Sequence, residues 1–267
     1  MNPGGKGANQ AVSAARLGGT VTFVAKIGND IFGKQSTKTF KKEKINIDYL
    51  FTDLNSPSGV ALITVDSKAE NCIVVAPGSN GNLNKLDIDK AKKSILESEI
   101  LLMQLEIPIE TVLYAAQMAS AAGKKVILNP APATILPDEL FKMLYILTPN
   151  ETEASFLSGI EVIDQGTAEK AALIIRGKKT PVVIITMGSK GALICTDKGA
   201  ELIPAPNIKA IDTTAAGDVF NGALAVALSE GLDLMKSVEF ANKAAAISVT
   251  RLGAQSSAPY RNELGEF

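Results

Sequence analysis

Two aspartates flank a run of small residues in the segment Asp212-Thr-Thr-Ala-Ala-Gly-Asp218, which directly precedes a long apolar helical pattern. At a helix start the free N–H groups and the aligned peptide dipoles attract an anion, and small side chains let it approach. A carboxylate at the same turn, Asp218, can accept a proton from an attacking hydroxyl. An anion hole beside a base is what phosphoryl transfer requires. The predicted anion hole consists of Ala215, Ala216 and Gly217.

The same segment has a simpler interpretation. Asp212 or Thr213 could be an ordinary helix N-cap, with Asp218 only favouring the helix dipole. Taken alone, these residues leave both interpretations open.

The absence of histidine from all 267 residues narrows the chemistry further. It excludes Ser–His–Asp and Cys–His catalysis and every histidine-ligated metal site, so a base must be Asp, Glu, Lys or Tyr. The two cysteines, Cys72 and Cys195, lie in separate apolar runs without metal-ligand spacing. We interpret them as buried, reduced thiols.

Composition indicates a globular protein without a charged docking surface. Apolar residues make up 46% of the chain, charged residues 21%, and the formal net charge is −1. Neither a nucleic-acid nor a membrane partner is expected from this balance. No apolar stretch reaches the ~20 residues of a membrane span, and the first residues lack a signal-peptide pattern. We therefore predict a cytoplasmic protein.

Short apolar runs alternate with amphipathic stretches, a pattern typical of βαβ units. It predicts an α/β fold, a three-layer αβα sandwich with a mostly parallel central sheet. Ligands of such sheets bind beyond the carboxyl ends of the strands. The predicted strands are Val21–Lys26, Ile100–Leu105, Lys125–Asn129, Tyr145–Thr148 and Val182–Thr186. The predicted helices are Asp87–Ser98, Ile109–Ala122, Thr167–Gly177, Ala216–Ser229 and Asp233–Arg251, with another from the first glycines to Leu17.

One segment departs from this alternation. Two β-rich runs, Gly59–Val65 and Asn71–Ala76, are joined by only five residues, 66–70, so they cannot form a parallel crossover. We predict a small antiparallel flap, a lid hairpin over residues 57–78 within a single domain of residues 1–267. An edge hairpin with no functional role is the alternative.

Motifs along the whole chain resemble those of the ribokinase-like carbohydrate kinase family. The segment 212–223 is similar to its C-terminal signature, and Asn2-Pro-Gly-Gly-Lys-Gly-Ala-Asn9-Gln-Ala to its N-terminal signature. The resemblance implies transfer of the γ-phosphate of ATP to a sugar hydroxyl, with Asp218 as the base. D-ribose, phosphorylated at its terminal hydroxyl, is the implied substrate, and 2-deoxyribose or a related sugar or nucleoside is the alternative. Further matching segments are Met103–Glu106, Asn129–Ala133, Thr148–Glu153 and Arg251–Gln255.

The resemblance assigns the glycine-rich N-terminal turn to the sugar. That turn is neither a G-x-x-x-x-G-K-[ST] phosphate loop nor a G-x-G-x-x-G dinucleotide loop, which excludes an NAD-dependent dehydrogenase. Without the resemblance, Glu106 would be a solvated strand end. The implied sugar-binding residues are Gly5, Lys6, Asn9, Glu106 and Asp218.

The resemblance also implies nucleotide and cation sites. For Asn150 and Glu153 the alternative is a helix capping box, and for the glycines near 190 it is a plain β-turn. The implied ATP-binding residues are Asn150, Thr186, Gly188, Gly191, Gly217 and Asn242. Glu153 would hold Mg²⁺ through water, and the implied K⁺ site comprises Asp212, Thr214, Ser248, Arg251, Gly253 and Ser257.

Family members normally begin with a strand that carries a Gly-Ser-x-Asn-x-Asp pattern, and this sequence opens at the second signature. We therefore expect the sheet to lack that strand and the sugar to lack two polar contacts. A truncated, inactive nucleotide-binding remnant is a further alternative. A homodimer through the lid hairpin is also implied.

Overall fold

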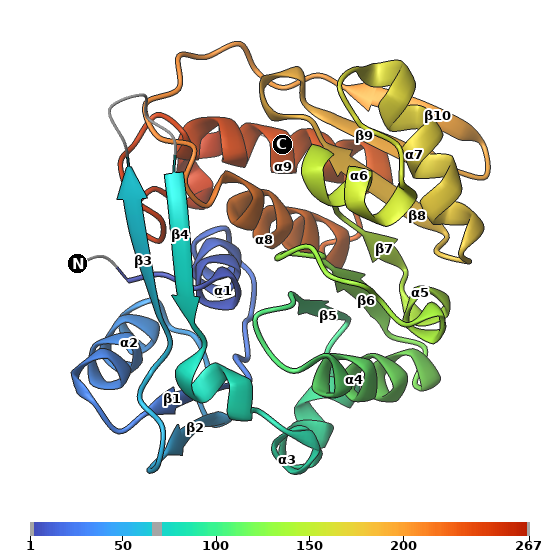
Figure 1. The fold of residues 1–267 in the computed structure, drawn as a ribbon. Coiled ribbons are helices and arrows are strands. Elements are labelled where there is room, and N and C mark those ends of the chain that lie inside the picture. The colour runs from blue at the N-terminus through green and yellow to red at the C-terminus, as the bar shows by residue number, and fades with distance from the viewer. Residues whose placement is uncertain (1–2, 66–70, 266–267) are drawn as a thin grey trace.

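A mostly parallel sheet runs through the centre of the molecule (Figure 1). The computed structural model describes residues 3–65 and 71–265, so Met1, Asn2 and the predicted hairpin link 66–70 lie outside the described residues. The sheet has the order β10-β9-β8-β7-β6-β5, with β5 to β8 parallel and β9 and β10 antiparallel to their neighbours. Its strands are β5 (Ile100–Met103), β6 (Lys125–Leu128), β7 (Ile146–Leu147), β8 (Val182–Thr186), β9 (Ala192–Thr196) and β10 (Gly199–Ile203).

Helices cover both faces of this sheet. Successive strand side chains point to opposite faces, so Val126 joins one apolar core while its neighbour Ile127 joins the other. The first core packs under α3 (Lys85–Glu97), α4 (Ile109–Ala121), α5 (Asp138–Met143), α6 (Glu151–Ser158) and α7 (Gln165–Gly177). The second packs under α1 (Lys6–Arg16), α8 (Ala216–Ser229) and α9 (Leu234–Ser248). The predicted α/β sandwich with a mostly parallel sheet is confirmed.

A second parallel pair lies beside the main sheet, formed by β1 (Ala25–Gly28) and β2 (Leu50–Asp53) and accompanied by α2 (Ile31–Lys42). The prediction of a central-sheet strand over Val21–Lys26 is wrong in its bounds and its partner. Val21 and Phe23 instead pack into a small core, where the rings of Phe23 and Phe40 meet edge to face, and Val24 packs against the first core of the main sheet. Only from Ala25 does the backbone enter a ladder, and its partner is β2.

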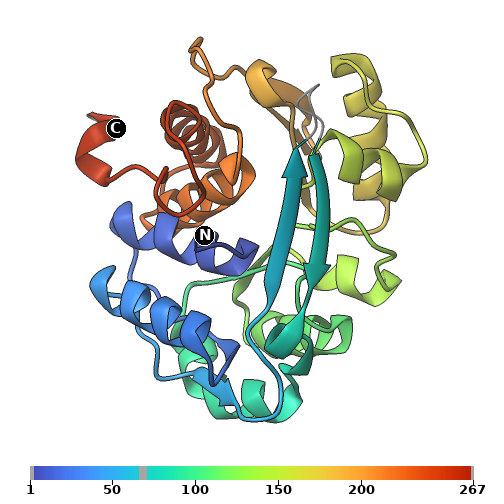
Figure 2. The same ribbon diagram turned by 60° about the vertical axis from the view of Figure 1, so that its left-hand side comes forward.

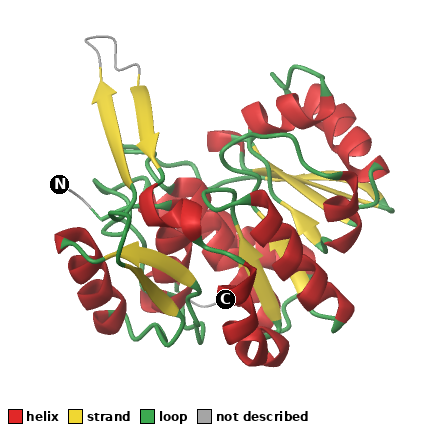
Figure 3. Ribbon diagram, turned by 60° about the horizontal axis from the view of Figure 1, so that its bottom comes forward, coloured by secondary structure: helices red, strands yellow, loops and turns green. Residues whose placement is uncertain are grey.

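The predicted flap is present as an antiparallel hairpin of β3 (Val60–Val65) and β4 (Asn71–Ala76). Its two strands run side by side in Figure 2, and Figure 3 shows the hairpin projecting beyond the helical layers. Its second strand leads into the 3₁₀ helix η1 (Gly78–Asn82). The other 3₁₀ turns are η2 (Gly188–Lys190) and η3 (Arg261–Leu264).

The C-terminal helices end close to where the sequence predicts. The prediction for Ala216–Ser229 agrees with α8, whereas α9 ends at Ser248 and not at Arg251. Residues 249–251 form turns closed by bonds such as Thr250 N–H to Ile247 O, so the helix ladder stops there. Among the described residues, no helix combines the length and apolar character that crossing a bilayer requires.

Candidate active site

A cavity of about 2230 Å³ opens where the N-termini of α1 and α8 meet the loop after β5. Most of the predicted sugar and K⁺ loop residues lie in its wall, although they come from three parts of the chain that are 97 residues or more apart. Within the described residues, the wall does not contain the predicted ATP residues. The predicted site residues that line it are Gly5, Lys6, Asn9, Glu106, Asp212, Thr214, Ala215, Asp218 and Gly253.

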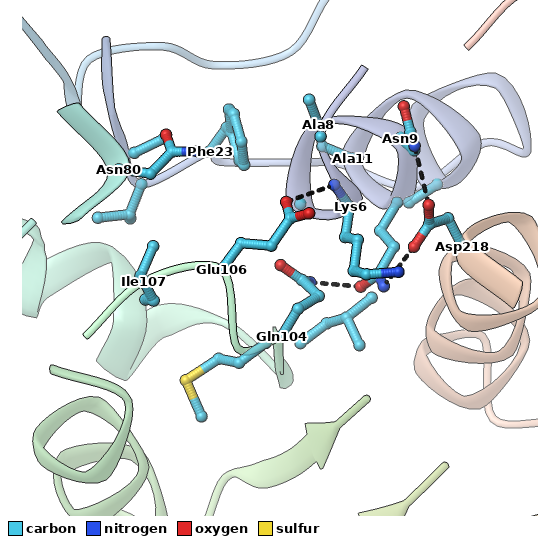
Figure 4. A pocket seen from close by; sticks show the side chains of 18 of the residues that line it. Lys6, Ala8, Asn9, Ala11, Phe23, Asn80, Gln104, Glu106, Ile107 and Asp218 are labelled. Atoms are coloured by element: carbon cyan, nitrogen blue, oxygen red, sulfur yellow. Dashed lines mark hydrogen bonds between the residues drawn. The ribbon is translucent and has the colours of Figure 1, made fainter. Parts of the chain in front are cut away.

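Asp218 occupies the third position of α8 and is only 6% exposed. Its two carboxylate oxygens accept separate hydrogen bonds, from Asn9 Nδ2 at 2.8 Å and from Gln10 Nε2 at 3.0 Å (Figure 4). Burial raises the pKa of the Asp218 carboxyl, and the charge of Lys6 together with the two amide donors lowers it in part. A carboxylate with a raised pKa that faces a cavity is a stronger proton acceptor than an exposed aspartate.

Gln10 connects three parts of the site, and the sequence analysis did not single it out. Besides Asp218, its amide nitrogen donates to Asn129 Oδ1 at 3.2 Å, and its carbonyl oxygen accepts from Gln104 Nε2. Asn129 in turn donates to Thr148 O at 3.1 Å. These amides fix the position of the Asp218 carboxylate. A signal was present in the sequence, because Gln10, Gln104 and Asn129 each lie in one of the motifs that resemble the family.

Glu106 holds the start of α1. Its Oε2 accepts the backbone N–H of Lys6 at 2.7 Å, so a carboxylate lies at the positive end of the helix. Burial raises the pKa of Glu106, whereas the N–H and the charge of Lys6 lower it. The Glu106 side chain is therefore partly buried, bonded to the start of α1 and facing the same cavity, and not a fully solvated strand end.

The turn before α8 presents free backbone donors. Ala215 adopts the left-handed conformation, with φ 60°, a strained state for a residue with a Cβ. In the described part of the chain, no hydrogen bond uses the N–H groups of Ala215, Gly217 or Asp218, whereas that of Ala216 donates weakly to Thr213 O at 3.2 Å. The turn therefore has free donors for an anion at Ala215 and Gly217 of the predicted hole, and a further one at Asp218.

Asp212 braces two loops beside this turn. Its oxygens accept the N–H groups of Thr214 and Gly253, each at 2.9 Å, and the bonds from Thr214 and Gly253 lower its pKa. The other predicted K⁺ residues use their side chains elsewhere. Ser248 and Ser257 donate to carbonyls of their own turns, and Arg251 pairs with Glu263. Among the described residues, no cluster of three carboxylates or thiols could hold a metal.

Asn150 and Glu153 form the capping box that was the alternative for them. Asn150 Oδ1 accepts the Glu153 N–H at 2.8 Å, and Glu153 Oε2 accepts the Asn150 N–H at 2.9 Å. Glu153 is nevertheless only 7% exposed, and burial raises its pKa while the charge of Lys6 lowers it. Asn150 bridges Thr186 at the end of β8, so the structure brings these two predicted ATP residues together.

Two other predicted ATP residues have local structural tasks. A Cβ on Gly191, at φ 108°, would lie 2.0 Å from Ile203 O, so close backbone packing against β10 requires glycine there. Asn242 Nδ2 donates to Ile203 O at 2.9 Å and holds the chain that follows β10. Gly188, with φ 55°, has no atom near its Cβ position, so packing does not explain it.

Comparison with known proteins gives one consistent answer. The ribokinase of Haemophilus influenzae is 47% identical over 264 residues, which cover 99% of this chain and 86% of that protein. The crystal structure of Thermotoga maritima ribokinase superposes with a TM-score of 0.88 at 44% identity, covering 98% of this chain and 86% of that one. Arabidopsis thaliana ribokinase, complexed with ribose and ATP, gives a TM-score of 0.93 at 31% identity, with 98% and 86% covered. Residues 1–261 match the family model of the pfkB carbohydrate kinases, and the chain therefore belongs to the pfkB family of carbohydrate kinases.

Proposed function

We propose that this protein is an ATP-dependent kinase that phosphorylates the terminal hydroxyl of D-ribose. The observation that carries the proposal is the buried carboxylate of Asp218, held by two amides at the start of α8 beside unused backbone N–H groups. The cavity it faces also presents Lys6, Asn9 and Glu106, polar groups suited to a polyhydroxyl ligand. The likeness to Arabidopsis ribokinase with its bound ribose supports the same substrate.

In this mechanism Asp218 accepts the proton of the attacking sugar hydroxyl as the phosphoryl group is transferred. Asn9 and Gln10 hold the carboxylate in place, so little rearrangement is needed during the reaction. The N–H groups of the predicted anion hole, Ala215, Ala216 and Gly217, stabilise negative charge on the phosphoryl oxygens, and the free N–H of Asp218 adds a further donor. Nucleotide contacts are proposed for Asn150, Thr186, Gly188, Gly191, Gly217 and Asn242.

The donor groups present are compatible with Mg²⁺ and K⁺. Glu153 is a buried carboxylate near the charges of Lys6 and Asp218, and it would hold Mg²⁺ through water. The lowered pKa of Asp212 keeps it ionised in the loop that would hold K⁺, together with carbonyl oxygens nearby. When bound, such cations would neutralise negative charge on the phosphates.

On composition we further propose a cytoplasmic protein. We also propose that the hairpin is a lid and pairs two chains in a homodimer. The exposed apolar side chains Val60 and Val75, 38% and 56% accessible, support the dimer. Sedimentation of the protein should then give twice the chain mass.

A coupled assay of ADP release tests the proposal. We expect turnover with ATP and ribose in the presence of Mg²⁺ and K⁺, and weaker turnover with 2-deoxyribose, which lacks one hydroxyl. Fructose and a nucleoside complete the panel. If 2-deoxyribose or another member gave the highest kcat/KM, the substrate assignment would be wrong. ATP binding without turnover on any sugar would instead support the inactive nucleotide-binding alternative.

A further inference from the structure

The base of the β3–β4 hairpin is bonded to the first turn of α2 through a single carboxylate. Asp30 Oδ2 accepts the backbone N–H of Ser58 at 2.7 Å, and Asp30 Oδ1 accepts the Ser58 hydroxyl at 2.8 Å. Oδ1 also caps α2 by accepting the N–H of Gly33 at 2.8 Å. The Ser58 hydroxyl oxygen accepts the N–H of Gly28, at the end of β1, at 3.0 Å. This joint, defined by Gly28, Asp30, Gly33 and Ser58, links three elements.

Glycines bring the backbones of the joint into direct contact. A Cβ on Gly28 would lie 2.3 Å from Ser58 N, and one on Gly33 would lie 2.2 Å from Gly28 O. On the other side of the hairpin base, a Cβ on Gly78 would lie 2.4 Å from Pro57 O. With such close contacts, β1, α2 and the hairpin base cannot shift toward one another without a backbone clash. The position of the hairpin base is therefore set by β1 and α2.

The hairpin base also forms part of the sugar cavity. Ser58, Gly59 and Val60 line the same cavity as Glu106 and Asp218. A shift of the joint would consequently move one wall of the cavity relative to the carboxylate of Asp218. Figure 4 shows the neighbouring side of this wall, where Asn80 of η1 lies across from Glu106.

We propose that Asp30 is a positioning residue, which holds the hairpin over the sugar through its bonds to Ser58. This inference rests on the proposed function, because it concerns the same cavity. A carboxylate is required here because its two oxygens together accept three hydrogen bonds, from the Ser58 N–H, the Ser58 hydroxyl and the Gly33 N–H. These bonds, led by that of Gly33, lower the pKa of Asp30 and keep it ionised.

Replacing Asp30 with asparagine should break the bond to Ser58 while preserving the cap of α2. Asparagine is as good an N-cap as aspartate, so its carbonyl oxygen can still accept the Gly33 N–H. Its amide nitrogen then replaces Oδ2 and faces the N–H of Ser58, donor against donor. The matched control is Asp233→Asn, because Asp233 caps α9 through the Lys236 N–H at 2.9 Å and has no bond to the hairpin.

We expect Asp30→Asn to raise the sugar KM roughly tenfold, which is the effect of losing one charged hydrogen bond. The KM for ATP should stay within about twofold, and Asp233→Asn should leave both constants unchanged. Hydrogen exchange of the β3 and β4 amides should accelerate in Asp30→Asn alone. Ser58→Ala should give the same changes, and the double variant should be no worse than either, since all three break one joint.

If Asp30→Asn matched Asp233→Asn in sugar KM and in β3–β4 exchange, the proposal would be overturned. Equal increases in the KM values for sugar and for ATP, with unchanged exchange of the β3 and β4 amides, would also overturn it. Such a result would show an effect that is not specific to the hairpin. Failure of the proposed function is distinguishable from this. In that case the unaltered protein would phosphorylate no sugar of the panel, whereas the exchange comparison would still test the joint.

Discussion

Replacing Asp218 with asparagine tests the base assignment at nearly constant shape. The side chain is 6% exposed, and each carboxylate oxygen has its own donor, Asn9 at 2.8 Å and Gln10 at 3.0 Å. Asparagine offers one oxygen to these two donors, so one buried amide loses its acceptor. The substitution also removes a buried charge whose pKa is raised by burial. The two effects on stability oppose one another, and we expect the free energy of unfolding to change by less than about 2 kcal/mol.

The effect on catalysis should be larger. A positioned general base contributes roughly 10²- to 10⁴-fold, which corresponds to about 3–5 kcal/mol in the activation free energy at 1.36 kcal/mol per tenfold. We therefore expect kcat to fall by at least about 100-fold in Asp218→Asn. Sugar affinity should change by only a few fold, because Lys6, Asn9 and Glu106 remain in place.

The assay is coupled ADP release for kcat, isothermal titration for sugar binding and thermal unfolding for the fold. Asp138→Asn is the matched control, since Asp138 is exposed in the first turn of α5 and is not among the residues that line the cavity. A folded Asp218→Asn protein that kept kcat within about tenfold of the unaltered protein would refute the base assignment.

Because burial raises the pKa of Asp218, kcat/KM in pH–rate profiles should fall with acidification at a pH above the usual aspartate range. Lys6→Met should move this acid limb to still higher pH, since the Lys6 charge lowers that pKa. Gln10→Met removes donors to Asp218 and Asn129, and should lower kcat and reduce the urea-measured free energy of unfolding by about 2 kcal/mol. Gly191→Ala should reduce that free energy by about 3 kcal/mol, because its Cβ would meet Ile203 O.

The segments with the clearest hydrophobic pattern were predictable, because that pattern is contained in neighbouring residues of the sequence. Val182–Thr186 and Ala216–Ser229 were predicted with the bounds that the structure gives them. The region of β1 and α2 was not, because Val21 and Phe23 are apolar for packing in the small core, and Thr22 forms only an isolated bridge to Asn46. An apolar run of that length predicts burial, and its hydrogen-bond partner depends on residues far along the chain.

The site was predictable in its residue types but not in its connections. The capping box at Asn150 and Glu153 follows from spacing alone. The contact of Gln10 with Asn129 and Asp218 joins positions 119 and 208 residues apart, which no local pattern encodes. A buried amide beside a buried carboxylate becomes informative only once the fold brings them together.

The charges around the cavity explain why Lys6 matters beyond any sugar contact. Burial raises the pKa of three carboxyl groups, Asp218, Glu106 and Glu153, and the Lys6 charge lowers the pKa of each. Three carboxylates around one ammonium group leave the cluster with excess negative charge when all are ionised. A nucleotide would add more, so binding ATP here without a compensating cation would be electrostatically unfavourable. We therefore expect nucleotide affinity to depend more steeply on Mg²⁺ than sugar affinity does.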